Sequence, residues 1–416
     1  MSNKIRNLTA FWIFGFCSLY TYQIILSAAH DLLNNKFVIR PTASNITTSQ
    51  TDASQTFQCN ELSTGTILLA DILPSLVLKL ILPYWHIHSH FGISLIAIML
   101  TASLILVGFT SAIWMTFLAV GGVSIATGLS EIMFLRISSM SYGKNEMVSW
   151  AAGTGAAAIV SATAYAALTT AGITIRNTLL FMLAIPVLMI LGYCFLLVHP
   201  KKLPKVDKTK IQDLKEAQIT ANSQNYNSIK SDCNGIEISH VHHKPSCFEK
   251  LKKIKSLLKY ALPLTIVYMA ENFINLGLYE LIYFPGIWLN HSEQYRWFLT
   301  DYQMGVFISR SLGMLFMWKK IWILPMLQVF NVALFLLQVI YGFVPSVWII
   351  FVLIFYEGLL GGATYVNIFG IMIDQVDEAD KEFAMSFVTV GDALGIALAG
   401  ALALPVHDFI CQQLHL

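Results

Sequence analysis

The chain of 416 residues is too apolar and too poor in charge for a soluble protein. Hydrophobic residues make up 56% of it and charged residues 12%, whereas soluble domains carry about 25% charged residues. The formal net charge of +2 gives no indication of a nucleic-acid partner, and we predict none. This composition is typical of a helical protein that crosses a lipid bilayer several times.

Eleven stretches are long and apolar enough to span a hydrocarbon core about 30 Å thick. The predicted spans are 8–29, 63–84, 92–110, 113–135, 149–170, 177–198, 260–284, 296–317, 321–342, 347–371 and 384–405. The first of them is longer than the 7–15 apolar residues of a signal peptide, so we expect it to be retained. The predicted fold class is therefore an all-α polytopic membrane protein.

The distribution of positive charge predicts the topology. Half of the 26 lysines and arginines lie between residues 200 and 260, which places this segment in the cytosol. Counting spans from it puts the N-terminus in the cytosol, and the loop 30–62 and the C-terminus in the lumen. Sequons at Asn45 and Asn290 fall on the luminal side, so we predict glycosylation at both. Cys59 and Cys411 fall there too and are candidates for a disulfide bond.

The same segment divides the chain into two helical parts. We predict a six-helix bundle over 1–198, a disordered cytosolic linker over 199–259 and a five-helix bundle over 260–416, since the linker is too poor in apolar residues to form a core. Within the linker, Tyr226 and Ile229 fit the tyrosine-x-x-apolar pattern that endosomal sorting adaptors bind. A trafficking adaptor that acts through this linker is therefore one alternative function.

Charged residues inside the apolar spans recur in the two halves. They are Asp71 and Lys79 on span two, Asp301 and Arg310 on span eight, Glu131 on span four and Glu357 on span ten. Parallel repeats of this kind build the major-facilitator transporters, with the substrate site between the halves. Lys79 lies near enough to the cytosolic end to extend its ammonium group out of the membrane, so we do not expect it in the site.

Other polar residues follow helical spacing within the spans. Tyr268, Glu271 and Asn275 share one face of span seven, and Gln303 lies on the Arg310 side of span eight. Such faces are expected to meet in a shared cavity, although for the neutral members hydrogen bonding that only joins helices is equally expected. Small residues around Gly153 and Gly395 predict close helix packing on spans five and eleven.

No enzyme motif is found. The chain has no Walker sequence, nucleophile elbow, HExxH or dinucleotide fingerprint. We therefore predict that the protein is not an enzyme, that it uses no cofactor and no metal, and that it is a secondary transporter which is coupled, if at all, to protons.

Several runs resemble the battenin family. They are LSAAHDLL (26–33), LLADILPSLVLKL (68–80), SWAAGTG (149–155), AENFINLGLYEL (270–281), QYRWF (294–298), FISRS (307–311), YEGLLGGATYVN (356–367) and LALPVHDFICQ (402–412). The resemblance covers residues 10–412 apart from the linker. It implies a lysosomal and late-endosomal membrane protein with a major-facilitator-like fold, distantly similar to the equilibrative nucleoside transporters.

The same resemblance implies a function in clearing glycerophosphodiesters, the deacylated products of phospholipids. Basic amino-acid transport and control of lysosomal pH are alternatives. Arg310 is the predicted phosphate ligand, because a guanidinium group matches phosphate oxygens. The predicted substrate-binding residues are Arg310, Glu271, Glu357, Asn275, Tyr268, Gln303 and Tyr365. The candidates for proton coupling are Glu131, Glu271, Glu357, His30, Asp31 and Asp392.

Overall fold

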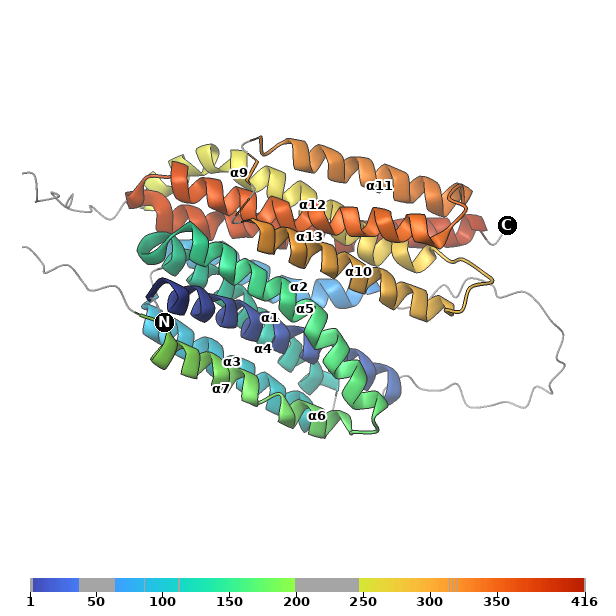
Figure 1. Ribbon diagram of the computed structural model, residues 1–416, viewed down its shortest axis with the longest axis horizontal. Coiled ribbons are helices and arrows are strands. Elements are labelled where there is room, and N and C mark those ends of the chain that lie inside the picture. Colours follow the sequence, from blue (N-terminus) through green and yellow to red (C-terminus); the bar gives the residue numbers. More distant parts are fainter. Residues whose placement is uncertain are drawn as a thin grey trace, which may run out of the picture. The chain divides into compact units, whose positions relative to one another are not determined.

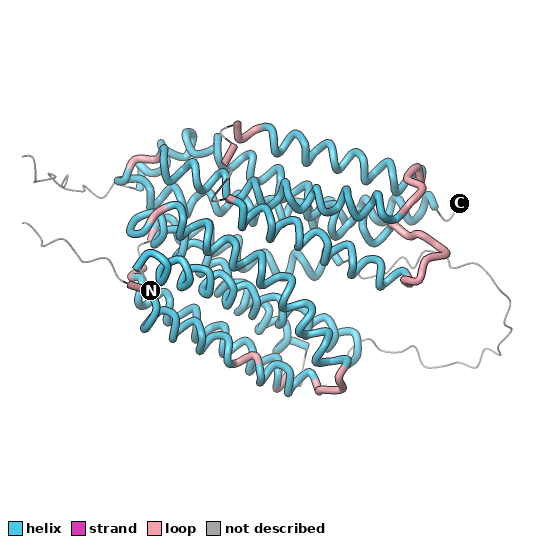
Figure 2. Tube along the Cα trace, in the orientation of Figure 1, coloured by secondary structure: helices cyan, strands magenta, loops and turns pink. Residues whose placement is uncertain are grey.

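The computed structural model describes residues 3–36, 64–85, 87–110, 113–198 and 247–414, with residues 314, 316 and 319 left out of the last range. Every regular element in these ranges is a helix, and Figures 1 and 2 show the helices running side by side along their lengths. The predicted all-α architecture is therefore present throughout the described part of the chain.

The helices coincide with the predicted spans. Their bounds are α1 Asn3–Lys36, α2 Thr64–Ile81, α3 Ser89–Gly108, α4 Ile113–Ile137, α5 Lys144–Thr170, α6 Ile175–Phe181, α7 Ala184–Leu191, α9 Cys247–Phe273, α10 His291–Leu312, α11 Ile323–Tyr341, α12 Val347–Gln375 and α13 Glu378–Leu414. Short irregular helices extend some of them: η1 Leu82–Tyr84, η2 Ser138–Tyr142, η3 Gly192–Leu196, η4 Ile274–Leu278 and η5 Tyr279–Leu281. Each predicted span overlaps at least one of these helices, and α6, α7 and η3 overlap the same span.

Among the described residues, nine helical segments are long and apolar enough to cross a membrane. Of the spans predicted from the sequence, α2 and α10 are the two that fall outside this set. In α10 the reason is its charge, since it carries Glu293, Arg296, Asp301 and Arg310. A membrane helix with so many charged groups has to turn them towards protein or water.

The helix contacts follow one pattern twice. In the first half α1 packs on α5, and α4 packs on both α2 and α3. In the second half α9 packs on α13, and α12 packs on both α10 and α11. The contacts between the halves are related in the same way. In this repeat α2 corresponds to α10 and α5 to α13, and α2 packs on α13 while α5 packs on α10. This packing agrees with the parallel repeat that the charges of spans two, four, eight and ten predict.

Glycines bring the helices of each half close together. A Cβ atom on Gly153 of α5 would overlap the carbonyl oxygen of Trp12 in α1. The corresponding contact of the second half is between Gly395 of α13 and the carbonyl oxygen of Thr265 in α9. The predicted small-residue faces of spans five and eleven are therefore helix-packing surfaces.

The helix α9 begins earlier than the predicted span seven. It starts at Cys247, inside the range 199–259 that we assigned to the linker, and continues without a break into the apolar span as far as Phe273, where η4 and η5 follow. Residues 199–246 lie outside the described part of the chain, so the predicted sorting residues Tyr226 and Ile229 do as well.

Candidate functional site

Arg310 lies where the two halves meet. It is half-buried near the end of α10. Its Nη1 donates a hydrogen bond to Thr154 Oγ1 of α5 at 2.6 Å, and its Nη2 donates to the Tyr268 hydroxyl of α9 at 3.3 Å. The guanidinium carbon lies 4.9 Å from the centre of the Tyr365 ring of α12. Side chains from both halves therefore surround this cation.

Arg310 has unused hydrogen-bonding capacity. Its Nε is buried and has no partner. Among the described residues, the ion pairs found do not include Arg310, so its charge is held by hydroxyl groups and an aromatic ring. A charged residue within a membrane-spanning helix usually has a partner of opposite charge, and the unpaired Nε of Arg310 suits an anion that comes from outside the protein.

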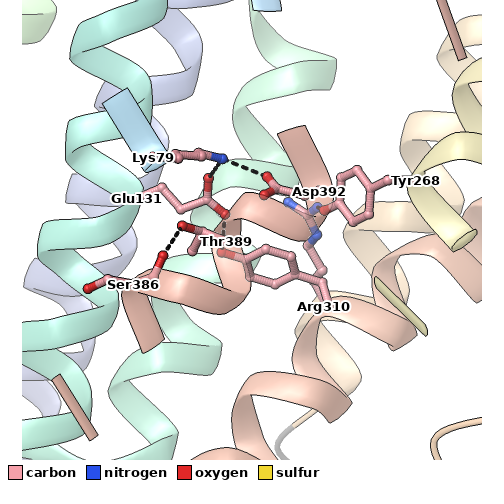
Figure 3. A network of polar contacts seen from close by, with 8 residues as sticks. Lys79, Glu131, Tyr268, Arg310, Ser386, Thr389 and Asp392 are labelled. Carbon is pink, nitrogen blue, oxygen red and sulfur yellow. Dashed lines mark hydrogen bonds and ion pairs between the residues drawn. The ribbon is translucent and has the colours of Figure 1, made fainter. Parts of the chain in front are cut away.

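Lys79 is the buried cation of the first half, and the prediction that it extends out of the membrane is wrong. It is 2% exposed. Its ammonium group lies 2.5 Å from Glu131 Oε2 of α4 and 2.7 Å from Asp392 Oδ2 of α13, as Figure 3 shows. The two carboxylates compensate for the loss of hydration, which a single partner rarely does.

Tyr365 connects the two cations. Its hydroxyl donates a hydrogen bond to Glu131 Oε1 at 2.7 Å, while its ring lies under Arg310. We call Lys79, Glu131, Arg310, Tyr365 and Asp392 the central cluster. Glu131, Arg310, Tyr365 and Asp392 were predicted from the sequence as candidates in four separate spans. The structure brings them together.

The two cations differ in their partners although they occupy related helices. Lys79 of α2 faces α13, and Arg310 of α10 faces α5, so each lies at one of the two repeated contacts between the halves. Lys79 is neutralised by two carboxylates. Arg310 is the cation of the pair that remains able to bind a ligand anion.

Glu271 lies next to this site. It is 5% exposed on α9, and its carboxylate is hydrogen-bonded to the Tyr302 hydroxyl of α10. Its Oε2 is buried without a hydrogen-bond partner. An ion pair between Glu271 and Arg310 is not found among the described residues. Glu271 therefore presents an unsatisfied oxygen close to Arg310 and Tyr268, with which it interacts electrostatically.

Glu357 belongs to a different group of side chains. It is 0% exposed on α12. Its Oε2 accepts a hydrogen bond from the Tyr279 hydroxyl at 2.6 Å, and its Oε1 accepts one from Gln328 Nε2 of α11 at 3.2 Å. The structure does not pair Glu357 with Arg310, and its role in substrate binding stays a prediction.

The remaining candidates are distributed more widely. Asn275 lies in the π-helical segment η4 beside Glu271 and has a buried Oδ1 without a partner. Gln303 is half-buried on α10. Asn290 caps α10, because its Oδ1 accepts a hydrogen bond from the Glu293 backbone at 2.9 Å. Glycosylation of Asn290 and the roles of Asn275 and Gln303 stay predictions.

Several predictions lie outside what the structure describes. Asn45 and Cys59 are outside the described residues. His30, Asp31 and Cys411 lie in the helices α1 and α13, but their side chains are outside the described part. The predicted disulfide bond and the predicted luminal proton site therefore remain predictions.

Three residues of the site were not predicted. Lys79 was set aside because of its place near the end of a span. Thr154 is not among the predicted site residues, although its hydroxyl lies between Gly153 and Gly155 and can both donate and accept a hydrogen bond. Tyr302 lies one position before Gln303 and is not among the predicted substrate-binding residues. It is 5% exposed, and buried tyrosine hydroxyls generally have a polar partner.

Comparison with known proteins gives a consistent family match. The family model described as CLN3 protein matches residues 9–413. Battenin of Canis lupus familiaris is 38% identical over 419 residues, which cover 98% of this chain and 92% of that protein. Protein BTN1 of Yarrowia lipolytica is 32% identical, with 97% of this chain and 94% of that protein covered.

Solved structures with the same fold are transport proteins. The fucose:proton symporter of E. coli aligns with a TM-score of 0.55 and 12% identity, covering 99% of both chains. The human organic anion transporter MFSD10 aligns with a TM-score of 0.60 and 11% identity, covering 100% of this chain and 97% of that one. At such identities the likeness concerns the fold alone, and it confirms the predicted major-facilitator-like class.

Proposed function

Because this chain belongs to the CLN3 protein family, as its resemblance to battenin predicted, we propose that it is a secondary transporter of lysosomal and late-endosomal membranes. The proposed substrates are glycerophosphodiesters, which it moves from the lumen to the cytosol. The observation that carries this proposal is Arg310, a half-buried cation between the two halves with no acidic partner among the described residues.

The chemistry around Arg310 fits a phosphodiester. The phosphate carries one negative charge, and its two free oxygens can accept hydrogen bonds from guanidinium nitrogens. Arg310 has a free Nε, and its Nη1 and Nη2 are bound only to the neutral hydroxyls of Thr154 and Tyr268. These hydroxyls can turn to the glycerol part of the substrate when the phosphate takes their place. A neutral substrate would leave the guanidinium charge uncompensated.

Transport measurements on the purified protein test the proposal. We expect proteoliposomes with the full chain to take up radiolabelled glycerophosphoglycerol in a saturable way. Hydrogen bonds between charged groups contribute about 1.5–3 kcal/mol, so Arg310→Ala should lower apparent affinity by about 10- to 150-fold. Arg310→Lys keeps the charge but not the planar donor geometry, and should lose less.

The matched control is Arg296→Ala on the same helix. Arg296 is exposed and lies outside the central cluster, so its removal should leave the flux unchanged. Phosphodiester flux that survives Arg310→Ala at unchanged affinity would overturn the assignment of Arg310. Absence of any phosphodiester flux in the wild-type protein would overturn the proposed substrate class.

A basic amino-acid transporter is the second candidate, and the observation that favours it is Glu271. The buried Oε2 of Glu271 has no partner and could bind a substrate ammonium or guanidinium group. This function predicts saturable lysine or arginine uptake that Glu271→Gln abolishes and Arg310→Ala preserves. The opposite dependence on the two residues supports the phosphodiester.

A further inference from the structure

Two polar contacts within the central cluster connect the halves of the molecule, in addition to the hydrogen bond from Arg310 to Thr154. Lys79 of α2 binds Asp392 of α13 at 2.7 Å, and Tyr365 of α12 donates to Glu131 of α4 at 2.7 Å. Lys79 also binds Glu131 within its own half at 2.5 Å. Movement of one half against the other at this level has to break or exchange these contacts. The cluster is thus placed to control such movement.

The charges around Lys79 do not balance. One ammonium group faces two carboxylates, so the three side chains carry a net charge of −1 when all are ionised. The side chains of Lys79 and Asp392 are 3% and 8% exposed, and that of Glu131 is 13% exposed. The Arg310 guanidinium makes the central cluster as a whole neutral while it binds no anion. A phosphate at Arg310 cancels that charge and leaves an excess charge of −1 in the cluster, which is costly in such surroundings and which one added proton removes.

The hydrogen-bond pattern indicates which carboxylate receives that proton. Both oxygens of Glu131 are occupied, one by Lys79 and one by the Tyr365 hydroxyl. Asp392 uses only Oδ2, and its Oδ1 is buried without a hydrogen-bond partner. A proton on Asp392 Oδ1 meets no existing hydrogen bond, whereas a proton on either oxygen of Glu131 competes with a bond that this oxygen already accepts.

Other titratable groups near Asp392 come from every side. On the helices packed against α13 these are Lys79 from α2, Glu131 from α4, Tyr268 and Glu271 from α9, and Tyr365 from α12. The segment η4 has no titratable residue, and Arg136, which lies five positions after Glu131 near the same end of α4, binds Ser386 and Glu382. Lys79 is therefore the cation in direct contact with Asp392, and the ion pair between them exists only while the Asp392 carboxylate is charged.

We propose that Asp392 binds the proton that travels with the phosphodiester, and that Lys79 transmits its binding to the contact between the halves. This inference rests on the proposed function. Protonation neutralises Asp392, Lys79 then remains paired with Glu131 alone, and the link between α2 and α13 opens. A phosphodiester carries one negative charge, so its movement together with one proton transfers no net charge across the membrane. The pH difference alone therefore drives this transport.

The proton site and the anion site communicate through Tyr365. The Tyr365 hydroxyl is bound to Glu131, and its ring lies 4.9 Å from the Arg310 guanidinium carbon. A phosphate at Arg310 adds negative charge to the central cluster, which favours proton uptake at Asp392. Substrate and proton therefore bind together more readily than either does alone, as a coupled transporter requires.

The test is glycerophosphoglycerol transport in proteoliposomes with an imposed pH difference. For one coupled proton, a difference of one pH unit drives about tenfold accumulation on the alkaline side. We expect this in the wild-type protein, together with substrate-dependent proton entry reported by a pH-sensitive dye. Asp392→Asn should abolish accumulation while exchange of labelled for unlabelled substrate continues. Exchange needs no net proton movement, and it also shows that the variant is folded.

Two further variants complete the experiment. Asp392→Glu retains a carboxyl group and should retain accumulation. Asp377→Asn makes the same chemical change at an exposed position outside the cluster and should behave as wild type.

The proposal is overturned if Asp392→Asn still accumulates substrate, or if it loses exchange as well as accumulation. It is also overturned if the wild-type protein transports glycerophosphoglycerol without responding to the pH difference, a result that leaves the proposed function intact. A wild-type protein that transports no phosphodiester contradicts the proposed function first.

Discussion

Glu357 offers a sharp test of the difference between a structural and a ligand-binding carboxylate. It is completely buried and accepts hydrogen bonds from Tyr279 and Gln328. Replacement by alanine leaves both donors without an acceptor, at a cost of about 1–3 kcal/mol each. The lost packing adds to this. We therefore expect Glu357→Ala to lower the free energy of unfolding by at least about 2–6 kcal/mol.

Glutamine should restore most of that loss. The Oε1 of a glutamine at position 357 can accept the Tyr279 hydroxyl. Its Nε2 can donate to Gln328 Oε1, which has no partner in the present structure, once the Gln328 amide turns over. The volume is unchanged and both polar atoms of the new side chain have partners. The number of unpaired Gln328 atoms also stays the same, because Oε1 gains a partner and Nε2 loses one. We expect Glu357→Gln to stay within about 1 kcal/mol of wild type and to keep its phosphodiester flux.

Thermal unfolding of the purified protein in detergent, followed by tryptophan fluorescence, measures these differences. Asp374→Ala is the control, because it removes a carboxylate whose side chain is 60% exposed and is paired with the partly exposed Lys144. Such surface pairs contribute about 0–1 kcal/mol. Equal stability of the alanine and glutamine variants would refute the reasoning. A stable glutamine variant without flux would assign Glu357 to transport instead.

Two further predictions concern helix packing and the end of the bundle that is predicted to be cytosolic. Gly153→Ala places a methyl group against the Trp12 carbonyl oxygen and should lower the free energy of unfolding by about 1–3 kcal/mol. Gly108→Ala is the control, because a methyl group there makes only ordinary van der Waals contacts with Leu179. Equal melting temperatures of the two variants would contradict this prediction. Lys144 and Asp374 join α5 to α12 at 3.0 Å with side chains 33% and 60% exposed. Lys144→Ala should therefore shift stability by less than about 1 kcal/mol, and a larger shift in the same assay would show a buried role.

Much of the membrane architecture could be predicted because it depends on local composition. Apolar stretches of sufficient length have to be helical in a bilayer, since no water is present to hydrogen-bond an open backbone. The predicted spans accordingly match the helices, and α9 departs from its prediction only by beginning earlier, at Cys247. The charged residues within spans were recognisable for the same reason, because they are rare and costly there.

The partners of those charged residues could not be predicted. The sequence indicates that Lys79, Glu131 and Asp392 lie within or near spans, but Asp392 is 313 positions away from Lys79. In an isolated helix, the Lys79 ammonium group would be expected to extend to the membrane surface. This expectation is wrong here because two neighbouring helices provide carboxylates within 2.7 Å.

The sequence by itself therefore determined the class of the protein and the positions of its spans. It also named Arg310 as the candidate phosphate ligand, which stays a prediction. Tertiary structure alone decided that Lys79 is neutralised while Arg310 is not, and that Glu357 binds Tyr279 and Gln328 instead of Arg310. The physical reason is that helical periodicity specifies which residues share a face. The neighbour that each face meets depends on the packing of distant helices, here set by contacts such as those of Gly153 and Gly395.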